Sequence, residues 1–135
     1  MPRSQPSTSS ESRRLIAGTI GRHVLADMYG VAPALLEDGD TLCASLCTAL
    51  RAAGFRILDT STHQFPGRHA GATAVVLLTE SHAAVHTYPE HQYLALDIFS
   101  CGPHDPEQVI ELLQQTWKPH HTILARHSRP LGPDN

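Results

Sequence analysis

The sequence predicts a two-layer α+β sandwich, with an antiparallel sheet and helices on one face of it. Several short segments are rich in β-branched and aromatic residues, and they alternate between apolar and polar positions as strands do. Two other segments repeat their apolar residues at helical spacing. The chain has 135 residues, which is enough for one sheet covered by helices but short for two independent cores.

Glycines and apolar spacing set the bounds of the first predicted elements. Gly30 can end the first strand, and Gly54 can stop the first helix. Between them, apolar residues recur every three or four positions from Leu42 to Leu50, and Asp40 or Thr41 can cap this helix. We therefore expect a strand over 21–29, a connection with a helical turn over 33–40, a helix that ends at Gly54, a strand over 55–60 and a loop over 63–71.

The later elements follow from composition and from proline. Residues 72–79 are apolar and β-branched, which predicts a buried central strand. Residues 82–87 alternate between two kinds of side chain, which predicts a strand with two different faces. Asp105 or Pro106 can open a helix that Pro119 ends. We expect further strands over 93–99 and 121–126, a turn at 89–91 and the second helix over 106–117.

One domain is predicted over residues 19–127, between a flexible tail at 1–18 and a C-terminal tail at 128–135. The apolar run of the first tail is too short for the core of a signal peptide, and no run of 18 apolar residues occurs in the chain. Cys43 and Cys47 share a face of the first helix and are typical small core residues. Three cysteines do not form the pattern of a disulfide framework, so we expect a cytoplasmic protein. Because no long apolar run occurs, we expect no membrane partner.

Charge and histidine spacing argue against two further classes of partner. The net charge is −3 and no basic run occurs, whereas a nucleic-acid-binding protein needs clustered Lys and Arg. The chain has ten histidines, but the spacing of His63, His69, His82, His86 and His91 matches no standard zinc pattern. We therefore expect neither a nucleic acid nor a metal ion as a partner.

The segment 79–102 concentrates reactive side chains beyond the needs of a core. The hydroxyl of Ser81 could attack the carbonyl carbon of Glu80 through a five-membered ring. Thr73 could supply a hydroxyl to the oxyanion, and His86 could move protons. β-Elimination and hydrolysis would then leave a pyruvoyl group. From the residues alone, the alternative is a strand-end serine with no chemical role; the Gly-x-Ser-x-Gly pattern of hydrolases is absent.

These residues resemble the prokaryotic S-adenosylmethionine decarboxylase proenzymes. The resemblance covers about residues 20–127. It is carried most specifically by Glu80-Ser81-His82, by His86-Thr87-Tyr88-Pro89-Glu90 and by Asp97-Ile98-Phe99-Ser100-Cys101-Gly102, with weaker matches at Gly21-Arg22-His23, Tyr29-Gly30 and His63-Gln64-Phe65.

The resemblance implies a self-cleaving enzyme. Cleavage between Glu80 and Ser81 would turn Ser81 into a covalent pyruvoyl cofactor, which accepts electrons from the bond that breaks in decarboxylation. By position, His86 would assist this processing, as would Thr73, which stands where the family usually has serine. Cys101 would donate a proton to the substrate α-carbon. An unperturbed thiol is mostly protonated at neutral pH.

The resemblance also implies a substrate site and a homodimer with active sites near its interface. Glu90 would bind the ribose hydroxyls of a small-molecule substrate, which would serve spermidine synthesis. Phe65 and Tyr88 would offer aromatic faces to the adenine and the sulfonium cation. The expected fold is the α+β sandwich.

Two departures from the family pattern keep the substrate open. Tyr88 stands where Trp is common, and the loop between Phe65 and Thr73 is about two residues longer than usual. Relatives of the family decarboxylate arginine or ornithine, so either amino acid is the alternative substrate. A non-cleaving homologue that regulates an active partner, and a histidine-rich metal-binding protein, are the other hypotheses.

Overall fold

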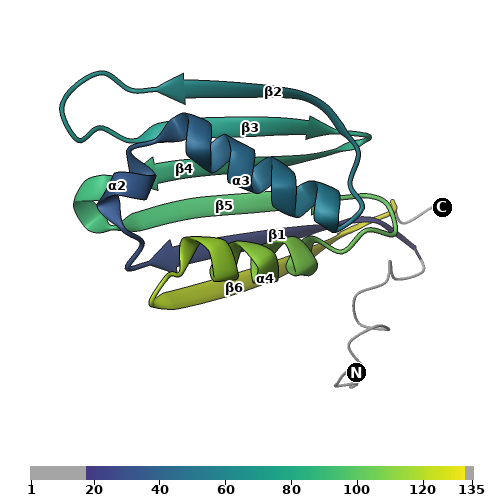
Figure 1. The fold of residues 1–135 in the computed structure, drawn as a ribbon. Helices are drawn as coiled ribbons and strands as arrows, with labels where there is room; N and C mark the ends of the chain where they lie inside the picture. The colour runs from purple at the N-terminus through teal and green to yellow at the C-terminus, as the bar shows by residue number, and fades with distance from the viewer. Residues whose placement is uncertain (1–17, 133–135) are drawn as a thin grey trace.

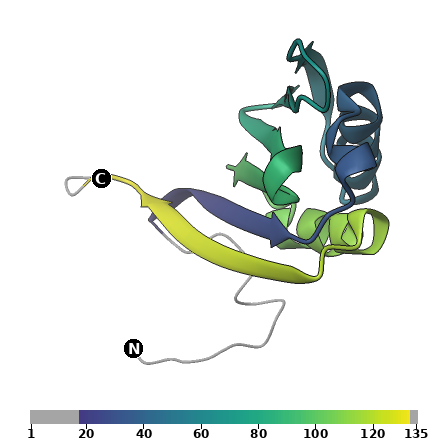
Figure 2. The ribbon, with the colours of Figure 1, turned by 90° about the vertical axis from the view of Figure 1, so that its left-hand side faces the viewer.

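The computed structural model describes residues 18–132 and confirms the predicted α+β sandwich. Two helices, α3 (Gly39–Ala52) and α4 (Pro106–Trp117), cover one face of an antiparallel sheet. The described residues place no helix on the opposite face, which we call the open face (Figures 1 and 2). The remaining elements are β1 (Thr19–Tyr29), α2 (Pro33–Leu36), β2 (Ile57–Gln64), β3 (Ala72–Leu78), β4 (Ser81–Tyr88), the short 3₁₀ helix η1 (Pro89–His91), β5 (Tyr93–Ser100) and β6 (His121–Pro130).

The order of the strands in the sheet is β2-β3-β4-β5-β1-β6. The strands β2 to β5 follow one another as neighbours, and β1 then enters between β5 and β6. Because β4 pairs with both β3 and β5, the start of β4 lies beside the end of β3 and the end of β5. This arrangement brings residues from distant parts of the chain to the beginning of β4.

The core lies between the sheet and the two helices. Helices present a stripe of apolar side chains, and strands present alternate residues, so both layers bury one face. The two cysteines of α3, Cys43 and Cys47, are buried, as predicted. Burial and the neighbouring Cys43 raise the pKa of the Cys47 thiol, which keeps it protonated. The largest fully buried side chains are Met28, Leu36, Leu42, Leu46, Leu50, Leu94, Ile98, Ile110 and Leu113.

The helix starts show one agreement and one correction. Asp105, one of the two residues predicted to open the second helix, caps α4, since its carboxylate accepts a hydrogen bond from the backbone N–H of Glu107. The cap of α3 is Asp38, not Asp40 or Thr41. Its carboxylate accepts from both the backbone N–H and the hydroxyl of Thr41, at 3.1 and 2.8 Å. Asp38 therefore holds the N-cap position, and Thr41 serves it as a donor.

Several strands differ in length from the prediction, because pairing rather than local composition sets where they end. β2 runs over 57–64 instead of 55–60, since it pairs with β3 as far as Gln64↔Ala72. β6 continues to Pro130, which pairs with Thr19, so the prediction of a tail from residue 128 is wrong. The predicted N-terminal tail, apart from Gly18, lies outside the described residues.

None of the helices in the described part of the chain combines the length and apolar character needed to cross a membrane.

Candidate active site

A tight two-residue turn joins β3 to β4 and contains the predicted cleavage position. Leu78 pairs with Ser81, so Thr79 and Glu80 form the turn between them. Glu80 has a φ of +56°, in the left-handed region that costs a residue with a side chain about 1–2 kcal/mol. The carbonyl group that Ser81 would attack therefore belongs to a strained residue.

Cys101 contacts both partners of the predicted reaction. Its Sγ lies 2.8 Å from the carbonyl oxygen of Glu80 and donates to it. Its backbone N–H donates to the Oγ of Ser81 at 3.2 Å, and the distance from that Oγ to Sγ is 3.7 Å. The thiol thus points at the oxygen on which negative charge would develop if Ser81 attacked the carbonyl carbon. The structure brings Glu80, Ser81 and Cys101 together.

The loop that carries Cys101 is held from two directions. The hydroxyl of Ser100 donates to the carbonyl oxygen of His104 at 2.9 Å, and the guanidinium of Arg22 donates to the same oxygen at 3.2 Å. The ring of His104 packs on Phe55, with centroids 5.4 Å apart. These contacts fix the loop that follows β5 and so fix the position of the thiol.

A cavity of about 280 Å³ lies beside this turn. Sequence reasoning assigned no role to Phe55 and His104, because neither belongs to the motifs around Ser81. The cavity is lined by Phe55, Arg56, Leu78, Thr79, Glu80, Ser81, Ser100, Cys101, Gly102, Pro103 and His104.

A second cluster gathers the other predicted site residues. The hydroxyl of Thr73 is hydrogen-bonded to Nδ1 of His86 at 2.9 Å. The same two residues line a cavity of about 680 Å³, together with the predicted Phe65, Tyr88 and Glu90. Its other lining residues are Arg68, His69, Ala70, Gly71 and Thr87.

The two clusters lie at opposite ends of the β3–β4 hairpin. Thr73 pairs with His86, whereas Leu78 pairs with Ser81 at the turn, five positions along both strands. At about 3.4 Å per residue, the separation is roughly 17 Å. Thr73 and His86 therefore do not reach Ser81 within one chain, and the prediction that they act there is not met inside a single protomer.

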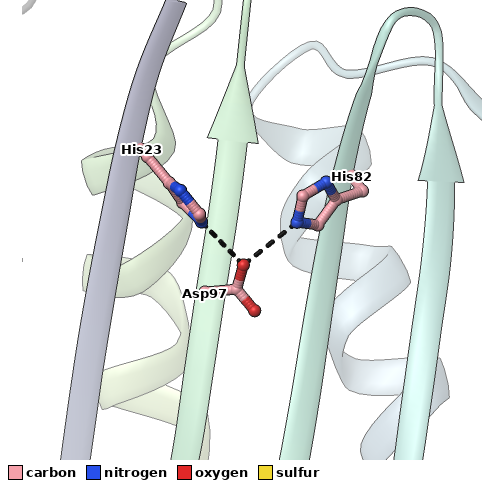
Figure 3. Close-up of side chains that lie close together, drawn as sticks. All are labelled: His23, His82 and Asp97. Atoms are coloured by element: carbon pink, nitrogen blue, oxygen red, sulfur yellow. Dashed lines mark hydrogen bonds and ion pairs between the residues drawn. The ribbon is translucent and has the colours of Figure 1, made fainter. Parts of the chain in front are cut away.

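A third group, which sequence reasoning did not assemble, lies on the open face. Nε2 of His23 and Nε2 of His82 lie 2.7 and 3.0 Å from the same carboxylate oxygen of Asp97 (Figure 3). The three residues come from the adjacent strands β1, β4 and β5. Among the described residues, these three form the group whose side-chain nitrogen and oxygen atoms lie close enough together to ligate a metal ion. Alternation along each strand could place each residue on this face, but their meeting depends on the strand order.

Comparison with known proteins places this chain among the decarboxylases. The model of the S-adenosylmethionine decarboxylase family matches residues 22–130. The chain belongs to the S-adenosylmethionine decarboxylase family.

Curated relatives and a solved structure agree with this assignment. The S-adenosylmethionine decarboxylase proenzyme of Brevibacillus brevis is 41% identical over 115 residues, which are 84% of this chain and 85% of that protein. The arginine decarboxylase proenzyme of Ignicoccus hospitalis is 30% identical over 131 residues, 93% of this chain and 91% of that protein. The crystal structure of the adenosylmethionine decarboxylase from Aquifex aeolicus matches with a TM-score of 0.76 and 29% identity, covering 87% of this chain and 96% of that one.

Proposed function

We propose that this chain is a proenzyme that cleaves itself between Glu80 and Ser81 and then decarboxylates S-adenosylmethionine through a pyruvoyl group. The product would be the aminopropyl donor for spermidine synthesis. The observation that supports this most directly is the contact of the Cys101 thiol with the carbonyl oxygen of Glu80, beside the Ser81 hydroxyl.

The processing chemistry uses atoms that lie at the turn. Oγ of Ser81 attacks the carbonyl carbon of Glu80, the bond from that carbon to the amide nitrogen of residue 81 breaks, and an ester links the two residues. Cys101 donates to the oxygen on which charge develops. Elimination then releases the Glu80 carboxylate, and addition of water to the dehydroalanine left at residue 81 expels ammonia and gives the pyruvoyl group. The left-handed backbone of Glu80 favours this direction, because cleavage releases its strain.

The backbone N–H and the thiol of Cys101 lie beside residue 81, and these donors suit a pyruvoyl group at that position. Once formed, such a group supplies an electron sink for the bond that breaks in decarboxylation. Cys101 would hold the proton that the substrate α-carbon receives. In the second cluster, Phe65 and Tyr88 offer exposed aromatic faces to a sulfonium cation, and Glu90 offers oxygens to ribose hydroxyls.

We further propose a homodimer in which each active site takes residues from both protomers. Ser81 and the Thr73–His86 pair are too far apart to act together in one chain. The open face exposes large apolar side chains at Leu25 and Leu77, which two copies could bury against each other. If two open faces pack with their strands antiparallel, the turn of one hairpin lies near the second cluster of the other.

Arginine or ornithine is the alternative substrate. Two observations favour keeping it: the relative from Ignicoccus hospitalis is named an arginine decarboxylase proenzyme, and Tyr88 replaces the Trp that is common in the family. The guanidinium of arginine or the side-chain ammonium of ornithine needs a carboxylate partner in the pocket, and Glu90 lines that pocket.

The experiment is intact-mass analysis of the purified protein, followed by measurement of CO₂ release. We expect two fragments, residues 1–80 and a pyruvoyl-started 81–135, whereas Ser81→Ala stays whole. Release of CO₂ from S-adenosylmethionine, with little from arginine or ornithine, supports the first substrate, and the reverse supports the alternative. A wild-type chain that stays uncleaved under all conditions contradicts the proposal and favours a regulatory homologue.

We also propose a cytoplasmic location, because the proposed reaction needs the thiol of Cys101 to stay reduced. The structure holds Cys43, Cys47 and Cys101 as free thiols, which a reducing compartment preserves.

A further inference from the structure

The group on the open face, His23, Asp97 and His82, has no role in the proposed reaction. We call it the His–Asp–His network. It joins β1, β5 and β4 through one carboxylate oxygen, which lies within hydrogen-bonding distance of both imidazoles (Figure 3). It stands one residue from the proposed cleavage position, because His82 directly follows Ser81.

Ring packing also holds the network in place. The imidazole of His82 stacks on Phe99, with centroids 6.1 Å apart and planes 23° from parallel. The ring of His23 meets both Phe99 and His82 edge-on, at 5.9 and 5.8 Å. The side chain of His82 therefore contacts β5 through Phe99 and Asp97. Asp97 in turn links it to His23 on β1.

Cleavage would remove the covalent connection that precedes β4. Before it, the turn at Thr79 and Glu80 holds Ser81 against Leu78. After it, residue 81 is a chain end, and His82 is the first residue whose side chain ties β4 to its neighbour. The amide that joins residue 81 to His82 is also the amide conjugated with the proposed pyruvoyl carbonyl.

We infer that the His–Asp–His network positions the pyruvoyl-bearing chain end for catalysis. This inference rests on the proposed cleavage at Ser81. His82 holds the end directly, whereas Asp97 and His23 act through it. Displacement of a reacting group by about 1 Å can lower a rate by 10²-fold, so loosening this tether would lower kcat more than it weakens substrate binding.

The kinetic test compares His23→Ala and Asp97→Asn with a matched control, His127→Ala. His127 pairs with His23 on the neighbouring strand, is exposed and takes no part in the network. We expect both network variants to cleave fully by intact mass and to lose about tenfold or more in kcat, with KM changed less than about threefold. His23→Gln, which can place an N–H near Asp97, should recover much of the loss, and His127→Ala should behave as wild type.

Hydrogen exchange gives a readout that does not depend on turnover. In the cleaved protein, His23→Ala should speed amide exchange at the start of β4. In the uncleaved Ser81→Ala background the intact turn still holds this segment, so the same substitution should change exchange much less.

Three results would overturn the inference while leaving the decarboxylase intact: unchanged kcat in both network variants, equal changes of exchange in cleaved and uncleaved protein, or stoichiometric zinc in the purified enzyme whose removal stops turnover. The last would make the group a metal site. A wild-type chain that neither cleaves nor releases CO₂ instead refutes the proposed function, and the positioning role falls with it.

Discussion

The two ends of the β3–β4 hairpin differ in how much of the reaction each can perform. At the turn, the strained backbone of Glu80, the Ser81 hydroxyl and the Cys101 thiol are in contact. The bond that would break in the proposed cleavage therefore lies beside a donor to its carbonyl oxygen. At the far end, Thr73 and His86 contact each other but no group of the turn. The difference supports the proposal that one protomer carries two half-sites, which a second copy would join.

The largest expected effect comes from mixing two inactive chains. Ser81→Ala cannot cleave because it lacks the nucleophile, and His86→Ala is expected to cleave poorly because it lacks the proton carrier. If half-sites join across a dimer, co-expression should restore cleavage in the His86→Ala chains that pair with Ser81→Ala partners. The measurement is intact mass with the two chains distinguished by a tag. No recovery in demonstrated mixed dimers would mean that each chain completes its own site.

The next largest effect is expected from removing the thiol of Cys101. Cys101→Ala removes the donor to the Glu80 carbonyl, so cleavage should slow by roughly tenfold or more, while still reaching completion. Turnover of the cleaved enzyme should then be low, because the α-carbon lacks its proton donor. Cys101→Ser keeps a donor and should cleave faster than Cys101→Ala. The time course of the mass change measures the first effect and CO₂ release the second; equal cleavage rates for all three proteins would contradict the contact.

A smaller effect is expected from the hydrogen bonds of Thr87, which hold the end of the β3–β4 hairpin that carries Thr73 and His86. The buried hydroxyl of Thr87 donates to the carbonyl oxygen of Leu36 at 2.7 Å and accepts from the backbone N–H of Ala72 at 2.8 Å. Thr87→Val keeps the shape but leaves these groups unpaired, which should lower the free energy of unfolding by about 1–3 kcal/mol. Thr87→Ser, which keeps the hydroxyl, should lose less. Urea unfolding measures both, and a Val variant as stable as wild type would refute this account.

The smallest effect appears only at high pH. Tyr93 donates to Asp27 at 2.6 Å, and burial together with this bond raises the pKa of the phenol above its ordinary value near 10. A raised pKa means that the folded state keeps a proton that the unfolded state loses, so this contribution is complete below about pH 10 and declines above it. Tyr93→Phe should therefore show a shallower loss of stability than wild type as the pH rises above about 10. Parallel pH profiles would exclude this contribution.

Local patterns predicted most of the fold, because strands and helices follow from side-chain periodicity. The helix over 106–117 and its cap at Asp105 are as predicted. The exceptions lie where a partner strand decides. Residues 61–64 are polar and exposed, so their sequence favours a loop, yet pairing with β3 makes them strand. The last strand likewise continues to Pro130 through pairing with β1.

The sequence by itself determined the reactive residues, their spacing along the chain and the layered fold, since these depend on residue type and short-range periodicity. Only the tertiary structure decided which of them meet. Extended strands carry residues five positions apart about 17 Å from each other, so His86 is far from Ser81 although it is close in sequence. Antiparallel pairing has the opposite effect, because it brings distant residues together. Ser81 and Cys101, 20 positions apart, are in contact, and so are His23 and Asp97, 74 positions apart.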